Sequence, residues 1–597
     1  MNKRSVWKFA LVPTIVMIVV AMYPQISLWV SRGSAWQGSY AAVNYDEVAY
    51  SAYISALIDG KPRKYDPMMG AEHEHESIYS LQFIPAYAIA LPARVLGLSA
   101  LNTFIILQIL IAIFCSLAVF YLLRTVTGDD IVSAAGVLIV LCLGTAITYE
   151  GALSELTGGS LVIEFHPFLR RYQPGLAFPL FFLMCAAVWK AFTSEDAKRI
   201  QASIAAGLLF AILVFSYFYL WTTAAAWLAC FFAVALIVGR SAKKTTLVNG
   251  LIMAGLGIGA LIPYFWMLSQ RSRKSDASQL LALTHAPDLT APIVVIGIIA
   301  VIVAILLGAK GRIEARSPEA IFAYAFLLTP FVVMNQQVIT GRSLQPVHYE
   351  IFIANYCLLT GIVIVAWLAI RGVKTEETDA ISNPASIKVW AYLGIAAALW
   401  GFYEASHATE RNSGMSLVRD LVTPAAKYIR DSSEGTTERI VVHSPNPITA
   451  SYIPTLVTGR ILWSPHLVSG GVVSEEESKQ QFYRFLYFSG FTHTELKSAL
   501  DAKWFEVTAA IFGGGRALPQ LGGINHPFTI QQTHAQHAKY RKFTETLTIA
   551  DAHEPSLTHL MVVESEPPNL ANIDRWYTRD EGHVAGLFKV YRLTPKP

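Results

Sequence analysis

The sequence predicts a polytopic α-helical membrane protein with about eleven transmembrane helices and a C-terminal soluble α/β domain. Of the 597 residues, 54% are hydrophobic and only 15% are charged, whereas about a quarter of a typical soluble protein is charged. The apolar residues form separate runs close to the ~20 residues that cross a ~30 Å hydrocarbon core. Near the C-terminus these runs give way to alternating strand-like and helix-like segments, which predict the soluble domain.

The first apolar run, 9–30, follows Lys3, Arg4 and Lys8. Its apolar stretch is longer than that of a signal peptide and no small-residue cleavage site ends it, so we expect a retained helix with a cytoplasmic N-terminus. The other predicted spans are 102–123, 131–147, a span that runs to 191, a closely spaced pair around 217–221, 247–268, 292–307, 321–338, 351–370 and 389–402. Lys and Arg recur at alternate span ends, which predicts an extracytoplasmic C-terminus.

A long loop, 31–100, follows the first span and lies on the outer face in this topology. It contains an amphipathic stretch, 48–58, and an apolar stretch, 81–98, which Pro85 and Pro92 interrupt. The apolar stretch is long enough to be a full span, but the prolines favour a helix that lies at the membrane interface.

We predict two domains: a transmembrane domain over 1–404 that includes the first outer loop, and an extracytoplasmic α/β domain over 405–597. Within the second domain the patterns predict strands at 440–443, 509–512, 559–563 and 587–591, and helices at 449–455 and 571–577. Strands that alternate with helices are typical of a small layered α/β domain. The glycines at 513–515 lack the spacing of a dinucleotide-binding turn, so we assign them no cofactor.

Charge and cysteine usage narrow the possible partners and the compartment. The net charge of +4 comes without a basic tail or aromatic-basic patch, so we expect no nucleic-acid partner. The five cysteines lie in apolar runs, which predicts neither a disulfide framework nor a Cys-based metal site. The chain has no Asn-x-Ser/Thr acceptor, which suits a bacterial inner (plasma) membrane better than the endoplasmic reticulum.

Two adjacent carboxylates, Asp46 and Glu47, stand near the start of the first outer loop, just before the amphipathic stretch. A carboxylate held at the membrane surface can act as a general base on an acceptor hydroxyl or amine. The alternative is a helix start, with Asp46 as the N-cap and Glu47 in the first turn. The two interpretations are compatible.

Residues 1–130 resemble the start of the GT-C glycosyltransferases, the class that includes the protein O-mannosyltransferases and the lipid A aminoarabinose transferases. The shared features are one span, an outer loop with Asp-Glu near its start, juxtamembrane helices and a helix that ends in Arg. In this chain they are Asp46-Glu47, Ile84-Pro85-Ala86-Tyr87, Gly97-Leu98-Ser99 and Tyr121-Leu122-Leu123-Arg124.

The resemblance implies a glycosyltransferase that moves a sugar from a polyprenyl-phosphate-linked donor to a glycan, lipid or protein acceptor at the outer face of the membrane. It implies that Asp46, or less readily Glu47, is the general base, and that direct displacement inverts the anomeric carbon. The chain departs from the oligosaccharyltransferases in lacking their Trp-Trp-Asp pattern, so N-glycosylation is not expected.

The first outer loop also contains the alternating segment Glu72-His73-Glu74-His75-Glu76. Imidazole and carboxylate ligands suit zinc or manganese, so His73 and His75 are candidate metal ligands. The alternative is a solvated charged loop, because side chains at this spacing share a face only if the segment is extended. No cofactor is required by the sequence.

The outer loop between the third and fourth spans contains Glu164, His166, Arg170 and Arg171. A guanidinium can bind two oxygens of a phosphate or carboxylate at once, so both arginines are candidate donor-phosphate ligands. Glu164 is a candidate second acid, and His166 a candidate ligand of the sugar or acceptor. The alternative is a membrane-surface anchor, with aromatic rings at headgroup level and arginines on lipid phosphates.

Two further outer segments contain candidate donor ligands. Arg271 lies in a basic segment, 270–274, that either holds the donor phosphate or contacts lipid headgroups. The stretch 335–350 concentrates amides, Arg, His and Glu at a helix end, where polar groups are costly and tend to be functional. In this stretch we predict that Arg342 and His348 bind the donor phosphate and that Gln336 and Gln345 orient sugar hydroxyls. The alternative is a polar turn that satisfies two helix ends.

Two other functions remain as alternatives: a transporter or flippase for a lipid-linked substrate, and a non-catalytic envelope-assembly protein. Transporters often have two related halves and charges near the membrane midplane. This chain has no clear internal repeat, and its polar residues gather at one face, which favours surface chemistry.

Overall fold

The computed structural model describes residues 3–159, 165–239, 243–272, 281–372, 384–435, 439–513, 529–566 and 568–597. The chain divides into two compact units. The helical unit contains residues 1–27, 106–266 and 283–412, and the mixed unit contains residues 28–105, 267–282 and 413–597.

The predicted spans correspond in order to long helices. These are α1 (Lys3–Arg32), α5 (Ala100–Thr127), α6 (Asp130–Cys142), α9 (Phe178–Thr193), α10 (Asp196–Val214), α11 (Phe218–Ile237), α12 (Lys243–Ser269), α13 (Pro292–Ala309), α14 (Pro318–Met334), α17 (Asn355–Arg371) and α18 (Pro384–Arg411). In the described part of the chain nine helices are long and apolar enough to cross a membrane, while α6 and α9 are apolar but shorter. The protein is therefore a multi-pass membrane protein, as predicted.

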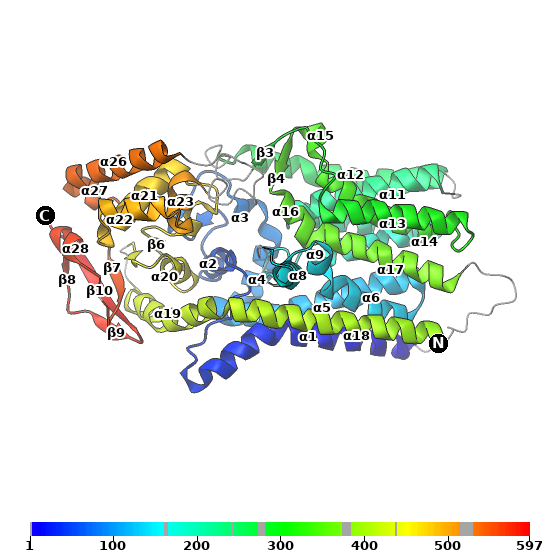
Figure 1. Cartoon of the computed structure of the whole chain (residues 1–597), viewed down its shortest axis with the longest axis horizontal. Coiled ribbons are helices and arrows are strands. Elements are labelled where there is room, and N and C mark those ends of the chain that lie inside the picture. Colours follow the sequence, from blue (N-terminus) through cyan, green and yellow to red (C-terminus); the bar gives the residue numbers. More distant parts are fainter. Residues whose placement is uncertain are drawn as a thin grey trace. The chain divides into compact units, whose positions relative to one another are not determined.

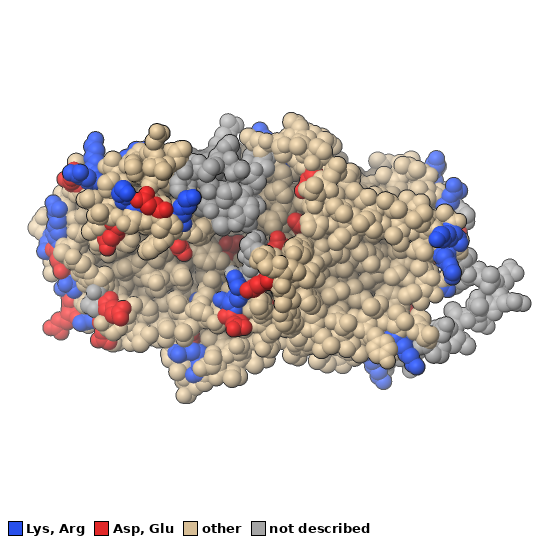
Figure 2. Space-filling view, viewed as in Figure 1, with Lys and Arg blue, Asp and Glu red and all other residues tan. Residues whose placement is uncertain are grey.

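Neighbouring helices of the helical unit pack in pairs, among them α9 on α10, α14 on α17 and α6 on α18. Large apolar side chains remain exposed along its flank, such as Leu251, Ile262 and Ile305. Figure 2 shows a flank that is nearly free of charged side chains, whereas Lys and Arg gather at one end of these helices. Such a surface is matched to lipid rather than to water, because apolar side chains face hydrocarbon without cost.

Local signals start several of these helices. Asp129 precedes α6, and its Oδ1 accepts hydrogen bonds from the backbone N–H groups of Ile131 (2.9 Å) and Val132 (3.1 Å). Ser317 precedes α14, and its hydroxyl oxygen accepts from the N–H of Ala320 (3.2 Å). Each cap satisfies backbone donors that the helix itself cannot pair.

The mixed unit contains a six-stranded sheet with strand order β6-β5-β7-β10-β8, in which β9 also pairs with β10. Its strands are β5 (Val441–His443), β6 (Arg460–Ile461), β7 (His559–Val563), β8 (Tyr577–Arg579), β9 (His583–Ala585) and β10 (Phe588–Pro595). β5 runs parallel to β6 and β7, whereas β10 is antiparallel to β7, β8 and β9. Figure 1 shows β8, β9 and β10 in red at the C-terminal end of the chain. The predicted C-terminal α/β region is confirmed.

The helices of this unit include α19 (Ser413–Ser432), α20 (Pro447–Tyr452), α21 (Glu475–Phe488), α22 (His493–Asp501), α26 (Ile530–Thr546) and α28 (Ala571–Trp576). The predicted helices at 449–455 and 571–577 correspond to α20 with the turn that follows it, and to α28. The predicted strand at 509–512 is wrong, because these residues end the helix α23 (Phe505–Phe512). Val507, Thr508 and Ile511 are its buried residues, and a short apolar run of this kind has no period that separates strand from helix.

The first outer loop forms α2 (Glu47–Ile58), the paired strands β1 (Tyr65–Asp66) and β2 (Ala71–Glu72), α3 (Ile78–Leu81) and α4 (Phe83–Val95). Its contacts group it with residues 413–597 in the mixed unit. The predicted domain boundary at residue 404 divides membrane-spanning from extracytoplasmic residues and stays a prediction. The two units are defined by contacts within the fold, so they do not test this boundary.

Candidate active site

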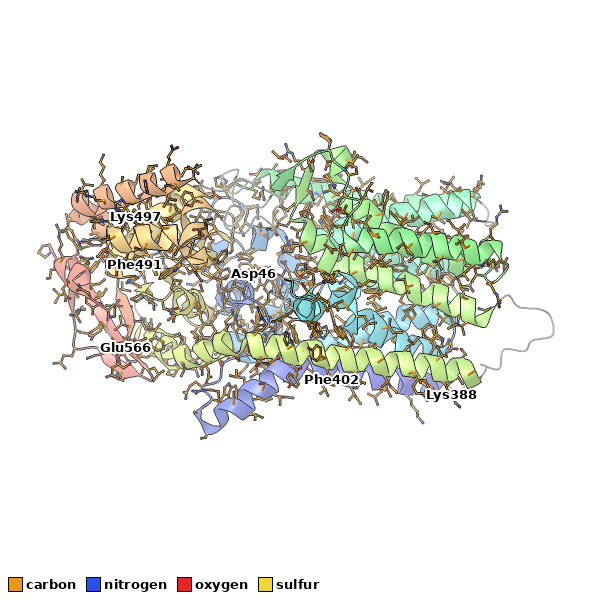
Figure 3. The ribbon with its side chains drawn as sticks, in the orientation of Figure 1. Asp46, Lys388, Phe402, Phe491, Lys497 and Glu566 are labelled. Carbon is orange, nitrogen blue, oxygen red and sulfur yellow. The ribbon has the colours of Figure 1, made fainter. Side chains whose placement is uncertain are left out.

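Asp46 directly precedes α2, as Figure 3 shows. Its backbone N–H donates to Oδ1 of Asn44 (3.0 Å), and the residue is half-buried. Although Asp46 occupies the N-cap position, its side chain makes no cap hydrogen bond to α2. The carboxylate is therefore not used as the helix cap that the local sequence offered as an alternative.

Glu47 has different surroundings from its neighbour. Its side chain is fully buried, and Oε2 accepts a long hydrogen bond from the N–H of Val43 (3.4 Å). The same oxygen lies 3.8 Å from Nη1 of Arg419, which is also buried. Of the two adjacent carboxylates, Asp46 is thus the more exposed.

The surroundings of Asp46 in the mixed unit include two ring systems that the sequence did not predict. The ring of Tyr45 lies 4.7 Å from that of His466, and Nδ1 of His466 lies 3.1 Å from Oγ of Ser469. Burial lowers the pKa of His466, although the negative charge of Asp46 opposes this effect. Burial raises the pKa of Tyr45, and Asp46 raises it further. Both rings are therefore held neutral at neutral pH beside this carboxylate.

Arg170 is enclosed in the helical unit. Its Nε donates to the carbonyl of Gln173 (2.7 Å) and its Nη2 to the hydroxyl of Tyr217 (3.2 Å). The guanidinium carbon lies 4.4 Å from the ring centre of Phe352, and the residue is only 3% exposed. A side chain in this position does not fit the alternative of a headgroup anchor at the lipid surface.

His348 and Gln345 lie in the same group. The ring of Tyr219 is 4.9 Å from that of His348, and its hydroxyl is 3.5 Å from Oε1 of Gln345. The His348 ring is also 5.0 Å from that of Phe352. The structure thus brings three of the predicted ligands together in one group, called here the Arg170 cluster: Arg170, Tyr217, Tyr219, Gln345, His348 and Phe352.

The backbone around this cluster is strained. Gln345 has φ 40° and ψ 72°, and the buried Tyr172 has φ 74°. Non-glycine residues rarely adopt this left-handed conformation, and such strain tends to persist at functional sites. The short helix α16 (Pro346–Tyr349) is followed by a π-helical turn, η4 (Glu350–Ala354), another feature that is frequent at functional sites.

Several carboxylates of the helical unit were not selected from the sequence. Glu350 lies within electrostatic reach of Glu150 and Asp288. Glu404 is 1% exposed, and both of its carboxylate oxygens accept from the N–H of Ala152 (3.1 Å each) at the start of α8 (Gly151–Leu156). A carboxylate next to a predicted span was the only sequence signal for Glu404 and for Glu150, which follow the predicted spans 389–402 and 131–147.

The other predicted ligands of the helical unit are His166, Arg171, Gln336, Arg342 and Glu164. Arg171 is buried, and Nε2 of His166 lies 3.0 Å from the carbonyl of Gly401. Arg342 is exposed on β4 (Arg342–Leu344), and its carbonyl accepts from Nε2 of Gln336 (3.0 Å). Glu164 lies outside the described residues.

The Glu-His segment of the first outer loop is held by an ion pair. The two carboxylate oxygens of Glu76 accept from Arg63 (2.6 and 2.7 Å), and Glu76 also forms a β-bridge with the predicted phosphate ligand Arg271. His75 is exposed and His73 is half-buried. Over the residues that the structure describes, no three His, Cys, Asp or Glu side chains gather as a metal site; metal binding by His73 and His75 stays a prediction.

Comparisons with known proteins give matches only at the level of structure. No protein-family model and no curated protein sequence matches the chain. The structure is similar to the apo crystal structure of the Archaeoglobus fulgidus oligosaccharyltransferase, with 11% identity and a TM-score of 0.50, covering 94% of this chain and 70% of that one.

A second similar structure is ArnT from Cupriavidus metallidurans bound to undecaprenyl phosphate, with 9% identity and a TM-score of 0.49. The match covers 99% of this chain and 98% of that one. Identities this low concern the fold alone. Together with the helix order and the C-terminal sheet, the similarity to the oligosaccharyltransferase shows that the chain shares the fold of that protein, in line with the GT-C-like fold predicted from the sequence.

Proposed function

We propose that the protein is a glycosyltransferase that moves a sugar from a polyprenyl-phosphate-linked donor to an acceptor at the outer face of a bacterial inner membrane. The observation that carries this proposal is the contrast between two adjacent carboxylates. Glu47 is buried beside Arg419, whereas Asp46 is half-buried and does not cap α2. A carboxylate that the fold does not use as a cap is suited to act as a base.

In the proposed reaction an acceptor hydroxyl or amine attacks the anomeric carbon of the donor sugar while Asp46 takes its proton. The bond between that carbon and the phosphate oxygen breaks, and the polyprenyl phosphate leaves with the electron pair. Direct displacement inverts the anomeric carbon. Negative charge grows on the leaving phosphate, so positive side chains at that position stabilise the transition state.

The Arg170 cluster is the best candidate for binding the donor phosphate. Its buried guanidinium donates to the phenol of Tyr217, and the same cluster contains the Gln345 amide and the His348 imidazole beside Tyr219, groups that can bind sugar hydroxyls. The predicted topology places the cluster and the first outer loop on the same outer face, with the N-terminus in the cytoplasm. Arg342, Arg271 and Arg171 remain further candidates for this role.

The test is transfer of label from polyprenyl-phosphate sugars in membranes that contain wild-type protein or the Asp46→Asn variant. Asp59→Asn is the matched control, because Asp59 is the C-cap of the same helix and receives a hydrogen bond from Thr458. We expect wild type and Asp59→Asn to transfer the label at similar rates. The rate of transfer by Asp46→Asn should be at least 100-fold lower. Full activity of Asp46→Asn would remove the base assignment, and no transfer from any donor would favour transport or envelope assembly.

A further inference from the structure

Two consecutive residues of α19 hold the segment that leads to Asp46. The first contact point is Asp420, which is fully buried. Its carboxylate accepts from Nε of Arg32 (2.8 Å), the N–H of Gln37 (2.9 Å) and the hydroxyl of Ser39 (2.9 Å). These bonds fix the beginning of the segment, because a carboxylate with three donors is rigidly oriented.

The second contact point is Arg419, which lies at the other end of the segment. Its Nη2 donates to the carbonyl of Asn44 (3.3 Å), and its Nη1 lies 3.8 Å from Oε2 of Glu47. Its guanidinium carbon is 4.9 Å from the ring centre of Tyr40. Arg419 therefore contacts the chain on both sides of Asp46.

Stability alone does not account for Arg419. The residue is 1% exposed, and in the described part of the chain its Nε and Nη1 have no hydrogen-bond partner. A buried charge with unsatisfied N–H groups is costly, and an apolar residue of similar volume is often at least as stabilising. The arrangement instead suits a residue that is kept to hold a particular geometry.

We propose that Arg419, acting through Asn44 and Glu47, is a positioning residue that fixes the orientation of the Asp46 carboxylate. The inference rests on the proposed function for its catalytic consequence, but the ordering of the turn at residues 44–47 is a separate, measurable effect. In this arrangement Glu47 helps to hold Asp46 in position through Arg419 and does not itself act as a base.

The experiment compares wild type with Arg419→Gln, Arg419→Lys and the double variant Glu47→Gln/Arg419→Gln. The double variant guards against unfolding, because removing both charges leaves no buried carboxylate without its partner. The matched control is Arg579→Gln, which breaks an ion pair with Asp574 (2.6 and 2.9 Å) elsewhere in the mixed unit. Transfer kinetics and hydrogen exchange of peptides covering residues 40–50 are measured for each protein.

We expect Arg419→Gln and the double variant to lower kcat about 100-fold with little change in the donor KM, as misplacement of a reacting group does. Arg419→Lys restores part of kcat, since it keeps the charge but not the fork. Exchange in residues 44–47 rises in both glutamine variants and not in Arg579→Gln. Unchanged exchange there, or an unchanged kcat in an active enzyme, would overturn the proposal. If wild type transfers no sugar, the proposed function fails, and the exchange result alone decides whether Arg419 orders the turn.

Discussion

The guanidinium of Arg170 lies 4.4 Å from the ring centre of Phe352, although the two residues are far apart in the sequence and Phe352 lies in η4. The same guanidinium donates to the hydroxyl of Tyr217 at the start of α11. One buried positive charge thus joins three segments of the helical unit that are far apart in the sequence. Arg170 is therefore the most informative position for testing donor binding.

Arg170→Gln is expected to raise the donor KM about tenfold or more, because a charge-assisted contact to phosphate is lost. The donor KM of Arg170→Lys is expected to lie between the values of wild type and Arg170→Gln, since an ammonium group keeps the charge but lacks the planar, two-pronged guanidinium. Initial rates over a range of donor concentrations measure the donor KM of each variant.

The matched control is Arg371→Gln. Arg371 also lies over an aromatic ring, with its guanidinium 5.0 Å from the ring centre of Trp367, but it ends α17, on the predicted cytoplasmic side. Arg371→Gln should leave the donor KM unchanged. An equal effect of the two variants would contradict a specific role for Arg170.

Gly151→Ala is expected to destabilise the helical unit by about 2–5 kcal/mol. Gly151 has φ 61°, and an added Cβ would lie 1.9 Å from Oε1 of Glu404. The left-handed backbone costs an alanine about 1–2 kcal/mol, and displacing Glu404 from the N–H of Ala152 costs about 1–3 kcal/mol more. Thermal unfolding in detergent measures the loss.

Gly158→Ala is the control for this prediction. Gly158 has φ 80°, but nothing lies within 4 Å of an added Cβ. Gly158→Ala should be destabilised only by the cost of the left-handed backbone. Its melting temperature should therefore fall less than that of Gly151→Ala. Equal shifts would mean that the contact with Glu404 contributes little.

Acid is expected to weaken the mixed unit through His443. Its ring is buried beside Phe485 (5.5 Å) and Phe488 (6.3 Å), and burial lowers its pKa to about 3. Between about pH 6.5 and 3 the unfolded chain binds a proton that the folded chain does not, so stability falls as the pH falls, by at most about 1.4 kcal/mol per pH unit.

His443→Phe removes the titrating group, so its unfolding free energy should depend less on pH in this window than that of wild type. Denaturant unfolding at pH 8, 6 and 5 measures the difference. Parallel pH profiles for the two proteins would show that His443 does not carry the effect.

Glu76→Gln is expected to destabilise the first outer loop by about 1–3 kcal/mol, because it removes charge-assisted hydrogen bonds with Arg63. Burial favours a raised pKa for Glu76, but the hydrogen bonds from Arg63 and Ser80 and nearby positive charge keep this pKa below its ordinary value. The stabilisation is therefore complete above about pH 4.5 and is lost as the pH falls further.

Hydrogen exchange across residues 63–80 measures this effect locally. Glu545→Gln is the control, because its ion pair with Arg541 is about 60% exposed on both sides and pairs of this kind contribute little. Exchange that stays as slow in Glu76→Gln as in the control would contradict a structural role for the Arg63–Glu76 pair.

The sequence by itself determined the order of the membrane helices and some of the C-terminal elements, whereas β6, β8, β9 and helices such as α21 and α26 were not predicted. Runs such as 247–268 and 292–307 match α12 and α13 because length and apolarity decide whether a segment crosses a bilayer, and both are local properties. Strands β5, β7 and β10 were likewise predicted from local alternation. The exception, α23, had a run too short to show its period.

The tertiary structure alone decided which polar residues have which partners. Asp46 and Glu47 are neighbours in sequence, yet only Glu47 is buried beside Arg419. The sequence left Arg170 as either a phosphate ligand or a surface anchor, and the structure encloses it among Gln173, Tyr217 and Phe352. The physical reason is that burial and pairing depend on segments far apart in the chain, which pack according to shape and charge and leave no periodic signal in the local sequence.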